Sequence, residues 1–223
     1  MAKSRAALLF DIDGTLVNTD ALHLEAFNRV FGPRGHVFDH RRFTDELQGF
    51  SMASIRERFL GDEPVERQLA IMEEKEAVFR ELAQGGVPPS PGLMALLDRA
   101  DRAGVPYAAV TNAPRLNAEM MLAGLGIAQR FKALVIGDEL AHGKPHPLPY
   151  LEGLRLLGAD AQTSVAFEDS RSGIQSATAA GIATVGMLTS LTAEEALAVG
   201  AVIAAKDFAD EGLVGLVRER VGV

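Results

Sequence analysis

The stretch Leu8-Leu9-Phe10-Asp11-Ile12-Asp13-Gly14-Thr15-Leu16 passes from a short apolar run into two carboxylates, a glycine and a threonine. This order is typical of a buried strand that ends in a polar turn. Because side chains alternate along an extended backbone, Asp11 and Asp13 point to one side and Ile12 returns to the packed face. An aspartate-rich turn that caps a helix would have the same sequence, so this motif alone leaves both interpretations open.

Two carboxylates held this close repel each other, so each needs a proton, a cation or hydrogen-bond donors. A hard divalent ion such as Mg²⁺ is the simplest partner, because it binds carboxylate and carbonyl oxygens. Gly14 leaves room for another group to approach the backbone, and the hydroxyl of Thr15 can hold one carboxyl in place. The stretch therefore predicts a cation site at the end of the first strand.

Composition excludes several classes of protein. The net charge of −8 argues against nucleic acid or an anionic membrane as a partner, and 223 residues can bury a full core. No apolar run approaches the roughly 20 residues that span a bilayer, and the apolar run after Arg5 is too short for a signal peptide. The absence of cysteine excludes disulfides, thiol catalysis and thiolate metal sites. We therefore expect a cytoplasmic protein.

After Thr15 the apolar residues follow helical spacing as far as Gly86. We expect one helix that ends at Gly32-Pro33, two short helices over 41–47 and 51–60, and a longer helix over 64–83. The apolar face of the long helix includes Val65, Leu69 and Met72, which predicts packing against other helices. The following run of glycine and proline over 85–89 predicts a linker.

Beyond this linker, strands and helices alternate. The pattern predicts strands over 105–110, 133–136, 164–167, 182–185 and 201–204, with helices between them and a capping box at Thr192. Such units imply a parallel sheet covered on both faces. We therefore predict an α/β fold with a Rossmann-like, three-layer α/β/α core built from residues 1–17 and 87–223, and an all-helical cap inserted over residues 18–86.

Polar residues follow several of the predicted strands, at the edge where open parallel sheets bind ligands. Taken singly, they are explained as a strand-end hydroxyl, a solvated lysine or a helix cap. Together they form a group rich in carboxylates, with one lysine and two small donors, which suits Mg²⁺ and a phosphoryl group. These residues are Asp11, Asp13, Thr111, Asn112, Lys144, Glu168 and Asp169.

Four short motifs carry a resemblance to a known family. In chain order they read D-I-D-G-T-L, V-T-N, G-K-P-H-P and F-E-D-S-x-x-G-I. Each motif is weak alone, but the ordered set is specific. From Leu8 to about Val185, the sequence resembles the haloacid dehalogenase superfamily. It is most similar to the branch with a helical cap after the first motif, which includes β-phosphoglucomutase-like and phosphoglycolate phosphatase-like proteins.

This resemblance implies a catalytic role for three residues. Asp11 would be the nucleophile that forms an aspartyl-phosphate. Asp13 would protonate the leaving oxygen and then activate water, a role that needs a pKa raised toward neutrality, which crowded carboxylates could provide. Lys144 would balance charge on the nucleophile and on the transferred phosphoryl group.

The resemblance also implies which residues bind phosphate and metal. Thr111 and Asn112 would hold phosphate oxygens. Asp169 would bind Mg²⁺ together with Asp11 and the backbone carbonyl of Asp13, and Glu168 would bind the ion or orient water around it. The metal would offset the negative charge collected at this point.

The cap is expected to decide the substrate. His23 falls where β-phosphoglucomutase-like proteins have a histidine that contacts the acid/base aspartate. Met52, in Gly49-Phe50-Ser51-Met52, takes the place of the mutase arginine that binds the far phosphate. Lys75 either faces the active site or is a solvated helix charge. Arg115 either reaches the anionic end of a substrate or caps its helix.

These observations predict a Mg²⁺-dependent phosphatase that hydrolyses a small phosphomonoester, such as a sugar phosphate or a phosphoglycolate-like acid. A sugar-phosphate mutase and a non-catalytic sugar-phosphate sensor remain alternatives. A dehalogenase would have no use for Asp13 and a metal ligand at Asp169. The expected partner is a small phosphorylated metabolite, with no nucleic acid or membrane partner, and the expected state is a monomer or weak homodimer.

Overall fold

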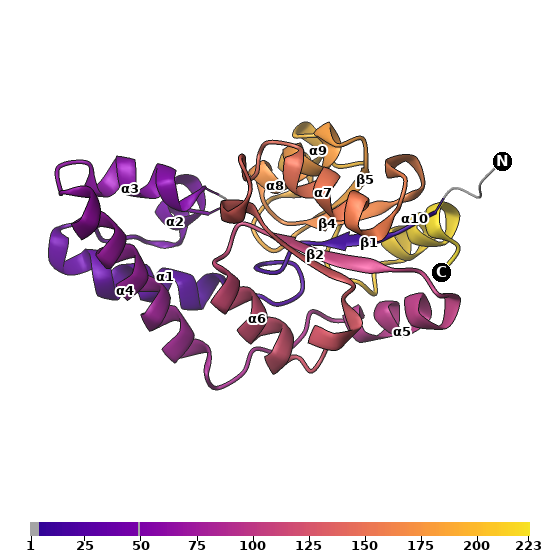
Figure 1. Cartoon of the computed structure of the whole chain (residues 1–223), viewed down its shortest axis with the longest axis horizontal. Helices are drawn as coiled ribbons and strands as arrows, with labels where there is room; N and C mark the ends of the chain where they lie inside the picture. Colours follow the sequence, from indigo (N-terminus) through magenta and orange to yellow (C-terminus); the bar gives the residue numbers. More distant parts are fainter. Residues whose placement is uncertain (1–4, 49) are drawn as a thin grey trace.

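Six parallel strands form one sheet, in the order β3-β2-β1-β4-β5-β6, in the computed structural model, which describes residues 5–48 and 50–223 (Figure 1). Gly49 and the first four residues therefore lie outside the described part. The strands are β1 (Leu8–Phe10), β2 (Tyr107–Thr111), β3 (Ala133–Ile136), β4 (Val165–Glu168), β5 (Ala183–Met187) and β6 (Ile203–Ala205). Phe10 of the central β1 pairs with Ala109 of β2 and Phe167 of β4, so the predicted parallel sheet is confirmed.

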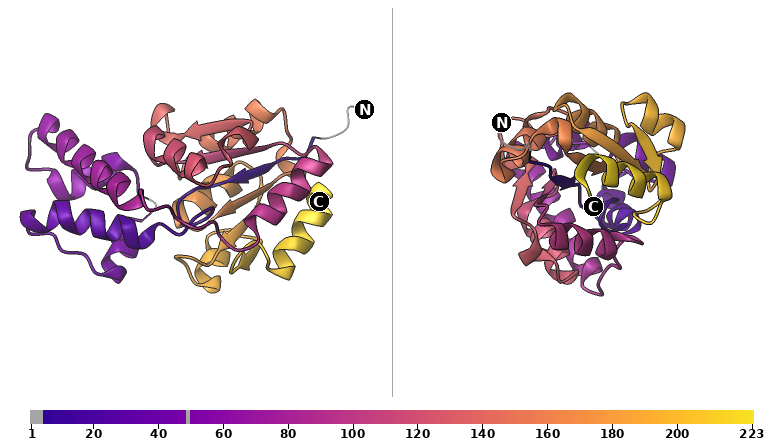
Figure 2. Two further views of the ribbon diagram at one scale, coloured as in Figure 1. Left: turned by 90° about the horizontal axis from the view of Figure 1, so that it is seen from below. Right: turned by 90° about the vertical axis from the view of Figure 1, so that its right-hand side faces the viewer.

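Helices cover both faces of this sheet, which gives the predicted three layers (Figure 2). Leu8 and Phe10 of β1 pack toward α5 (Leu93–Ala103), α6 (Arg115–Gly124) and α10 (Glu211–Val221). Leu9 turns to the opposite face, which is covered by α7 (Leu148–Leu157), α8 (Arg171–Ala179) and α9 (Ala193–Ala198). Burial on both faces explains why the strands are continuously apolar.

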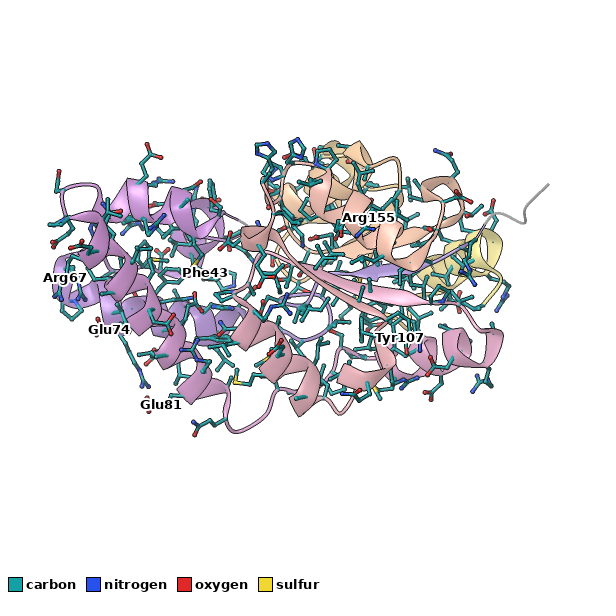
Figure 3. All side chains as sticks on the ribbon, in the orientation of Figure 1. Phe43, Arg67, Glu74, Glu81, Tyr107 and Arg155 are labelled. Carbon is teal, nitrogen blue, oxygen red and sulfur yellow. The ribbon has the colours of Figure 1, made fainter. Side chains whose placement is uncertain are left out.

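The segment between β1 and α5 forms a helical cap beside the sheet (Figures 1 and 2). Its helices are α1 (Asp20–Phe31), α2 (His40–Glu46), α3 (Met52–Leu60) and α4 (Val65–Ala83). They share an apolar cluster of their own, in which Phe27, Phe31 and Phe43 are buried (Figure 3). This second core explains how the insertion can fold beside the sheet, while its exact limits at residues 18 and 86 stay a prediction.

The buried face of α4 differs from the predicted one. Val65 and Leu69 are 64% and 52% exposed. The helix instead buries Ile71, Met72, Lys75, Glu76, Phe79 and Ala83. The prediction is confirmed for Met72 and wrong for Val65 and Leu69, because the buried stripe is displaced to include Lys75 and Glu76, which pair with each other.

Several element boundaries shift by a few residues. The first helix after the linker begins at Leu93, because Gly92 has a φ of +79° and a Cβ at Gly92 would lie 2.5 Å from the backbone nitrogen of Ala209. The capping box at Thr192 is confirmed. Four short 3₁₀ segments were not predicted: η1 (Gly32–Arg34), η2 (Ala128–Arg130), η3 (Gly137–Glu139) and η4 (Ala161–Thr163).

None of the helices in the described ranges has both the length and the apolar composition needed to cross a bilayer.

Candidate active site

The turn after β1 brings a backbone and a carboxylate unusually close. Gly14 has a φ of +77°, and a Cβ at this position would lie 2.0 Å from Oδ2 of Asp169. Its carbonyl oxygen accepts a hydrogen bond from Thr189 Oγ1 at 2.5 Å. Glycine is therefore required both for the backbone conformation and for the approach of Asp169, as the sequence predicts.

Three buried carboxylates meet at the carboxyl ends of β1 and β4. One oxygen from each of Asp11, Glu168 and Asp169 lies within 4.8 Å of the others. Lys144 Nζ lies 2.6 Å from Asp11 Oδ1 and 2.5 Å from Glu168 Oε1. Tyr150, buried on α7, donates a hydrogen bond of 2.6 Å to Glu168 Oε1. One ammonium group thus faces three carboxylates.

The pKa values reflect this excess of negative charge. Burial raises the pKa of Asp11 well above its usual value, although the adjacent Lys144 acts to lower it. Burial and then the charge of Asp11 raise the pKa of Asp169 in the same direction. Burial acts to lower the pKa of Lys144, but Asp11 and Glu168 outweigh it and the net shift is upward. The site favours any change that adds positive charge.

This donor set fits a hard divalent cation. Buried carboxylate oxygens are the ligands that Mg²⁺ and similar ions bind, and Lys144 is the only cationic side chain that pairs with this cluster in the part of the chain that the structure describes. The cluster includes Glu168 and Asp169, as predicted for metal binding. The side chain of Asp13 is not part of it, because that carboxylate turns toward the cap.

Asn112 fixes the loop that carries Lys144. Its Oδ1 accepts a hydrogen bond of 3.1 Å from the backbone nitrogen of Lys144, and its Nδ2 donates one of 3.3 Å to the carbonyl oxygen of the same residue. A Cβ on Gly137 would lie 2.1 Å from Asn112 Oδ1, so that glycine leaves room for the amide. The amide therefore orients Lys144, a role that the sequence did not predict. Thr111 Oγ1 accepts a hydrogen bond of 2.9 Å from the backbone nitrogen of Ala113.

The side chain of Asp13 is held by residues on α1 and just before it. Its Oδ1 accepts a hydrogen bond of 2.8 Å from Thr19 Oγ1 and lies 3.3 Å from His23 Nε2. His23 Nδ1 in turn lies 3.0 Å from Lys75 Nζ. Lys75 is 2% exposed and lines the same cavity, so it faces the site and is not a solvated charge.

The pKa of Asp13 contradicts the expected direction. Burial acts to raise it, but the hydrogen bonds from His23 and Thr19 and the positive charge of Lys75 together outweigh burial, and the pKa lies below its usual value. The sequence suggested crowding by carboxylates. The structure instead turns Asp13 toward positive and hydrogen-donating groups, which favour its ionised form.

A second group of residues, from the cap and from the loop after β5, touches the carboxylate cluster. Ser190 Oγ donates a hydrogen bond of 2.6 Å to Asp169 Oδ2, and Gln48 Nε2 lies 3.4 Å from the same oxygen. Gln48 also donates to Asp20 Oδ1 at 3.0 Å. Sequence analysis missed these three residues because no motif contains them.

The predicted site residues mostly meet in one cavity of about 130 Å³ between cap and core. This volume is below the roughly 300–1,000 Å³ typical of ligand pockets. The cavity is lined by Asp11, Asp13, His23, Met52, Lys75, Thr111, Asn112, Lys144 and Asp169, among others.

Two expectations need correction. Arg115 does not line this cavity, because its guanidinium pairs with Glu139 at 2.6 Å and with Glu119 at 3.3 Å on the half-exposed surface of α6. Thr15 Oγ1 is buried and has no hydrogen-bond partner among the described residues, so it does not hold a carboxylate.

Comparisons with known proteins agree with this geometry. The family model described as haloacid dehalogenase-like hydrolase matches residues 8–187. A phosphorylated carbohydrates phosphatase from Thermotoga maritima is 32% identical over 86% of this chain and 89% of its own. Protein CbbY from Rhodobacter capsulatus is 33% identical over 79% of this chain and 82% of its own.

Solved structures agree as well. The crystal structure of CbbY from Rhodobacter sphaeroides in complex with phosphate is 30% identical, with a TM-score of 0.83, and the match covers 96% of this chain and 99% of that one. Fold, sequence and motif order lead to the same assignment. This chain belongs to the haloacid dehalogenase-like hydrolase family.

Proposed function

We propose that this protein is a Mg²⁺-dependent phosphatase that hydrolyses a small phosphorylated sugar or a similar phosphomonoester through an aspartyl-phosphate. The observation that carries the proposal is the position of Lys144 Nζ, 2.6 Å from Asp11 Oδ1, beside a buried carboxylate cluster that requires further positive charge. A phosphoryl group and a divalent ion would complete that charge balance.

In the first step, Asp11 attacks phosphorus while the bond from phosphorus to the leaving oxygen breaks. Lys144 holds the nucleophile and faces the negative charge of the phosphoryl group. Asp13 supplies the proton that the leaving oxygen needs. The incoming dianionic phosphate raises the pKa of Asp13 by repulsion, so a carboxyl that is ionised in the free protein takes up a proton when the substrate binds.

In the second step, water attacks the phosphorus of the aspartyl-phosphate and Asp13 accepts a proton of that water. The bond from phosphorus to the Asp11 oxygen breaks, which restores the free carboxylate and produces inorganic phosphate. The lowered pKa of Asp13 keeps its carboxylate ionised once the leaving group has departed, so it is free to accept that proton. Asp11, Glu168 and Asp169, with the backbone carbonyl of Asp13, would hold Mg²⁺. The ion would offset the charge that the phosphoryl group brings to the site.

The proposed substrate class rests on the cavity and on the relatives. A phosphorylated carbohydrates phosphatase is among the similar proteins. The cap side of the cavity combines Phe27, Phe50 and Met52 with polar groups, which suits the ring faces and hydroxyls of a sugar. Met52 brings no positive charge to the place where a mutase would bind a second phosphate, so water is favoured as the phosphoryl acceptor.

The test is phosphate release from p-nitrophenyl phosphate and from a panel of sugar phosphates, with Mg²⁺ or with EDTA. We expect turnover in the presence of Mg²⁺ and none in EDTA, and we expect the activity to disappear in Asp11→Asn. Full activity in that variant, or in EDTA, would contradict the mechanism. Binding of sugar phosphates without turnover would instead favour a sensor. Conversion of β-glucose 1-phosphate to the 6-phosphate after priming with a bisphosphate would favour a mutase.

A further inference from the structure

A continuous line of buried polar groups leads from the core helix α6 to Asp13. Asn117 Nδ2 donates a hydrogen bond of 2.6 Å to Glu76 Oε2. Glu76 Oε1 lies 2.9 Å from Lys75 Nζ, which lies 3.0 Å from His23 Nδ1. His23 Nε2 lies 3.3 Å from Asp13 Oδ1. The line starts in the core, crosses the cap and returns to the core.

Asn117 is the point at which this line is anchored. It is 1% exposed, and its amide lies between two residues one turn apart on α4. Its Nδ2 faces the Glu76 carboxylate, and its Oδ1 accepts a hydrogen bond of 3.1 Å from the Arg80 guanidinium. A carboxylate on one side and a guanidinium on the other leave one orientation for the amide. Asn117 therefore fixes the carboxylate of Glu76.

Glu76 in turn fixes the ammonium group of Lys75. This pair is buried, with side chains 2–3% exposed, and Lys75 Nζ also lies 4.4 Å from the ring centre of Phe27. Burial acts to raise the pKa of Glu76, but Lys75, His23 and the hydrogen bond from Asn117 together outweigh burial, and the net shift is downward. If the Glu76 carboxylate moved away, the buried ammonium group of Lys75 would lose its counter-charge and would reorient toward other acceptors.

The position of Lys75 decides which nitrogen of His23 carries hydrogen. An ammonium group has donors and no acceptor, so His23 Nδ1 must accept from Lys75 Nζ. In the neutral ring, Nε2 then carries the hydrogen and donates to Asp13 Oδ1. The imidazole is also stacked on Phe79, with ring centres 3.9 Å apart and planes 6° apart, so it cannot tilt freely.

We propose that Asn117 is a positioning residue for proton transfer at Asp13: through Glu76, Lys75 and His23 it maintains the hydrogen bond that orients the acid/base carboxylate. This inference rests on the proposed phosphatase function and adds to it a residue on a core helix, outside the sequence motifs. The same contact joins cap to core, so the carboxylate is oriented when the cap is seated on α6.

If Asn117 positions Asp13 for proton transfer, its loss should slow esters with a poor leaving group more than esters with a good one. A poor leaving group must receive a proton as its bond breaks, whereas a good one leaves as an anion. Phenolate, whose conjugate acid has a pKa of about 10 like that of tyrosine, needs the proton far more than p-nitrophenolate does. The two phosphate esters otherwise have nearly the same shape. The ratio of their kcat/KM values therefore reports proton transfer to the leaving group, because kcat also includes hydrolysis of the aspartyl-phosphate that both esters share.

The experiment measures kcat and KM for phenyl phosphate and p-nitrophenyl phosphate, with Mg²⁺, in the full chain. In Asn117→Ala we expect kcat/KM for phenyl phosphate to fall by about 10-fold or more and kcat/KM for p-nitrophenyl phosphate by less than about 3-fold. Glu76→Gln removes the counter-charge of Lys75 and should have the same selective effect. Leu116→Ala, 61% exposed on the same helix, is the matched control and should keep the wild-type ratio.

Asn117→Asp separates the two contacts of the amide. It keeps an acceptor for Arg80 but places a second carboxylate beside Glu76, so the defect should be at least as large as in Asn117→Ala. A wild-type ratio in Asn117→Asp would show that only the Arg80 contact matters and would overturn the proposal. An equal loss for both esters in Asn117→Ala would do the same, since a misplaced cap slows every substrate.

A measurement without turnover gives an independent check. Long-range proton–nitrogen NMR correlations of the His23 ring should report hydrogen on Nε2 in the wild type and a mixture of tautomers in Asn117→Ala. An unchanged ring signal would overturn the positioning role even if activity fell. If the wild type released phosphate from neither ester, the proposed function itself would fail, which is a result distinct from an active wild type with an unselective variant.

Discussion

Asp169→Asn should make the metal-free protein more stable and the enzyme nearly inactive. Oxygens of Asp11, Glu168 and Asp169 lie within 4.8 Å of one another, a separation at which two unit charges repel by about 3.5 kcal/mol at an effective dielectric constant of about 20. Lys144 contacts Asp11 and Glu168, whereas Asp169 is held by the hydroxyl of Ser190. Removing the charge of Asp169 therefore relieves repulsion and breaks no ion pair.

Partial protonation of Asp169 in the wild type limits the gain in stability that the substitution produces. Burial and the charge of Asp11 raise the pKa of Asp169, so the folded wild type already relieves some repulsion by binding a proton. We expect the free energy of unfolding in EDTA to rise by about 1–2 kcal/mol, the usual size of a stabilising substitution at a functional site. For a chain of this length the melting temperature should rise by about 2–4 °C per kcal/mol.

The pH dependence follows from the same shift. Because the pKa of Asp169 is higher in the folded than in the unfolded protein, the folded state binds more protons between these two values. The wild type without metal should therefore gain stability as the pH falls from 7 toward the unfolded pKa of about 3.9, while Asp169→Asn should gain less. Because Asp11 and Asp169 repel each other, the loss of the Asp169 charge also lowers the pKa of Asp11, which weakens the pH dependence of the variant further.

Thermal unfolding with EDTA or with excess Mg²⁺, at pH 7 and pH 5.5, is the assay. Mg²⁺ at 100 times its Kd would stabilise the wild type by about 2.7 kcal/mol, and the variant should gain much less. Phosphate release should fall by about 100-fold. Asp62→Asn, a change of the same charge at an exposed position, is the control. The reasoning is refuted if Asp169→Asn is less stable than the wild type in EDTA, or if Mg²⁺ stabilises both equally.

Three further substitutions test individual contacts. Gly14→Ala should lower the affinity for Mg²⁺ and destabilise the protein by at least about 1–2 kcal/mol, because a Cβ would lie 2.0 Å from Asp169 Oδ2 at a φ of +77°; calorimetric titration and thermal unfolding check this, and wild-type affinity would contradict it. Tyr150→Phe should cost about 1–3 kcal/mol in urea unfolding, because Glu168 loses a buried donor at 2.6 Å; an unchanged midpoint would count against this account. Thr192→Ala should cost about 1 kcal/mol by loss of the capping box of α9 and leave kcat unchanged; a fall in kcat would show that this helix end affects the site.

Local patterns were sufficient to predict the sheet. Apolar runs bounded by glycine and polar turns identified all six strands, and their alternation with helices required parallel pairing. Phe10 and Ala109 face each other in register, as expected for adjacent buried strands. The prediction for the polar turn after β1 was also correct, since Gly14 leaves the room that Asp169 needs to approach the backbone.

The environment of Asp13 could not be predicted in the same way. Its pKa depends on His23 and Lys75, which lie 10 and 62 positions further along the chain and reach it only because α1 and α4 pack together. The error for Val65 and Leu69 has a related cause. An apolar stripe predicts which face is buried only when burial is apolar, and the buried stripe of α4 carries an ion pair.

Sequence by itself determined the parallel sheet, the helical insertion and the residues at the strand ends, because periodicity and turn chemistry depend on neighbouring residues. Only the tertiary structure decided that Asn112 hydrogen-bonds to the backbone of Lys144 and that Tyr150 donates a hydrogen bond to Glu168. It also decided that Asn117 is linked to Asp13 through the cap. These contacts join segments far apart in the chain. Their energies depend on distance and burial, which exist only after the helices have packed against the sheet and one another.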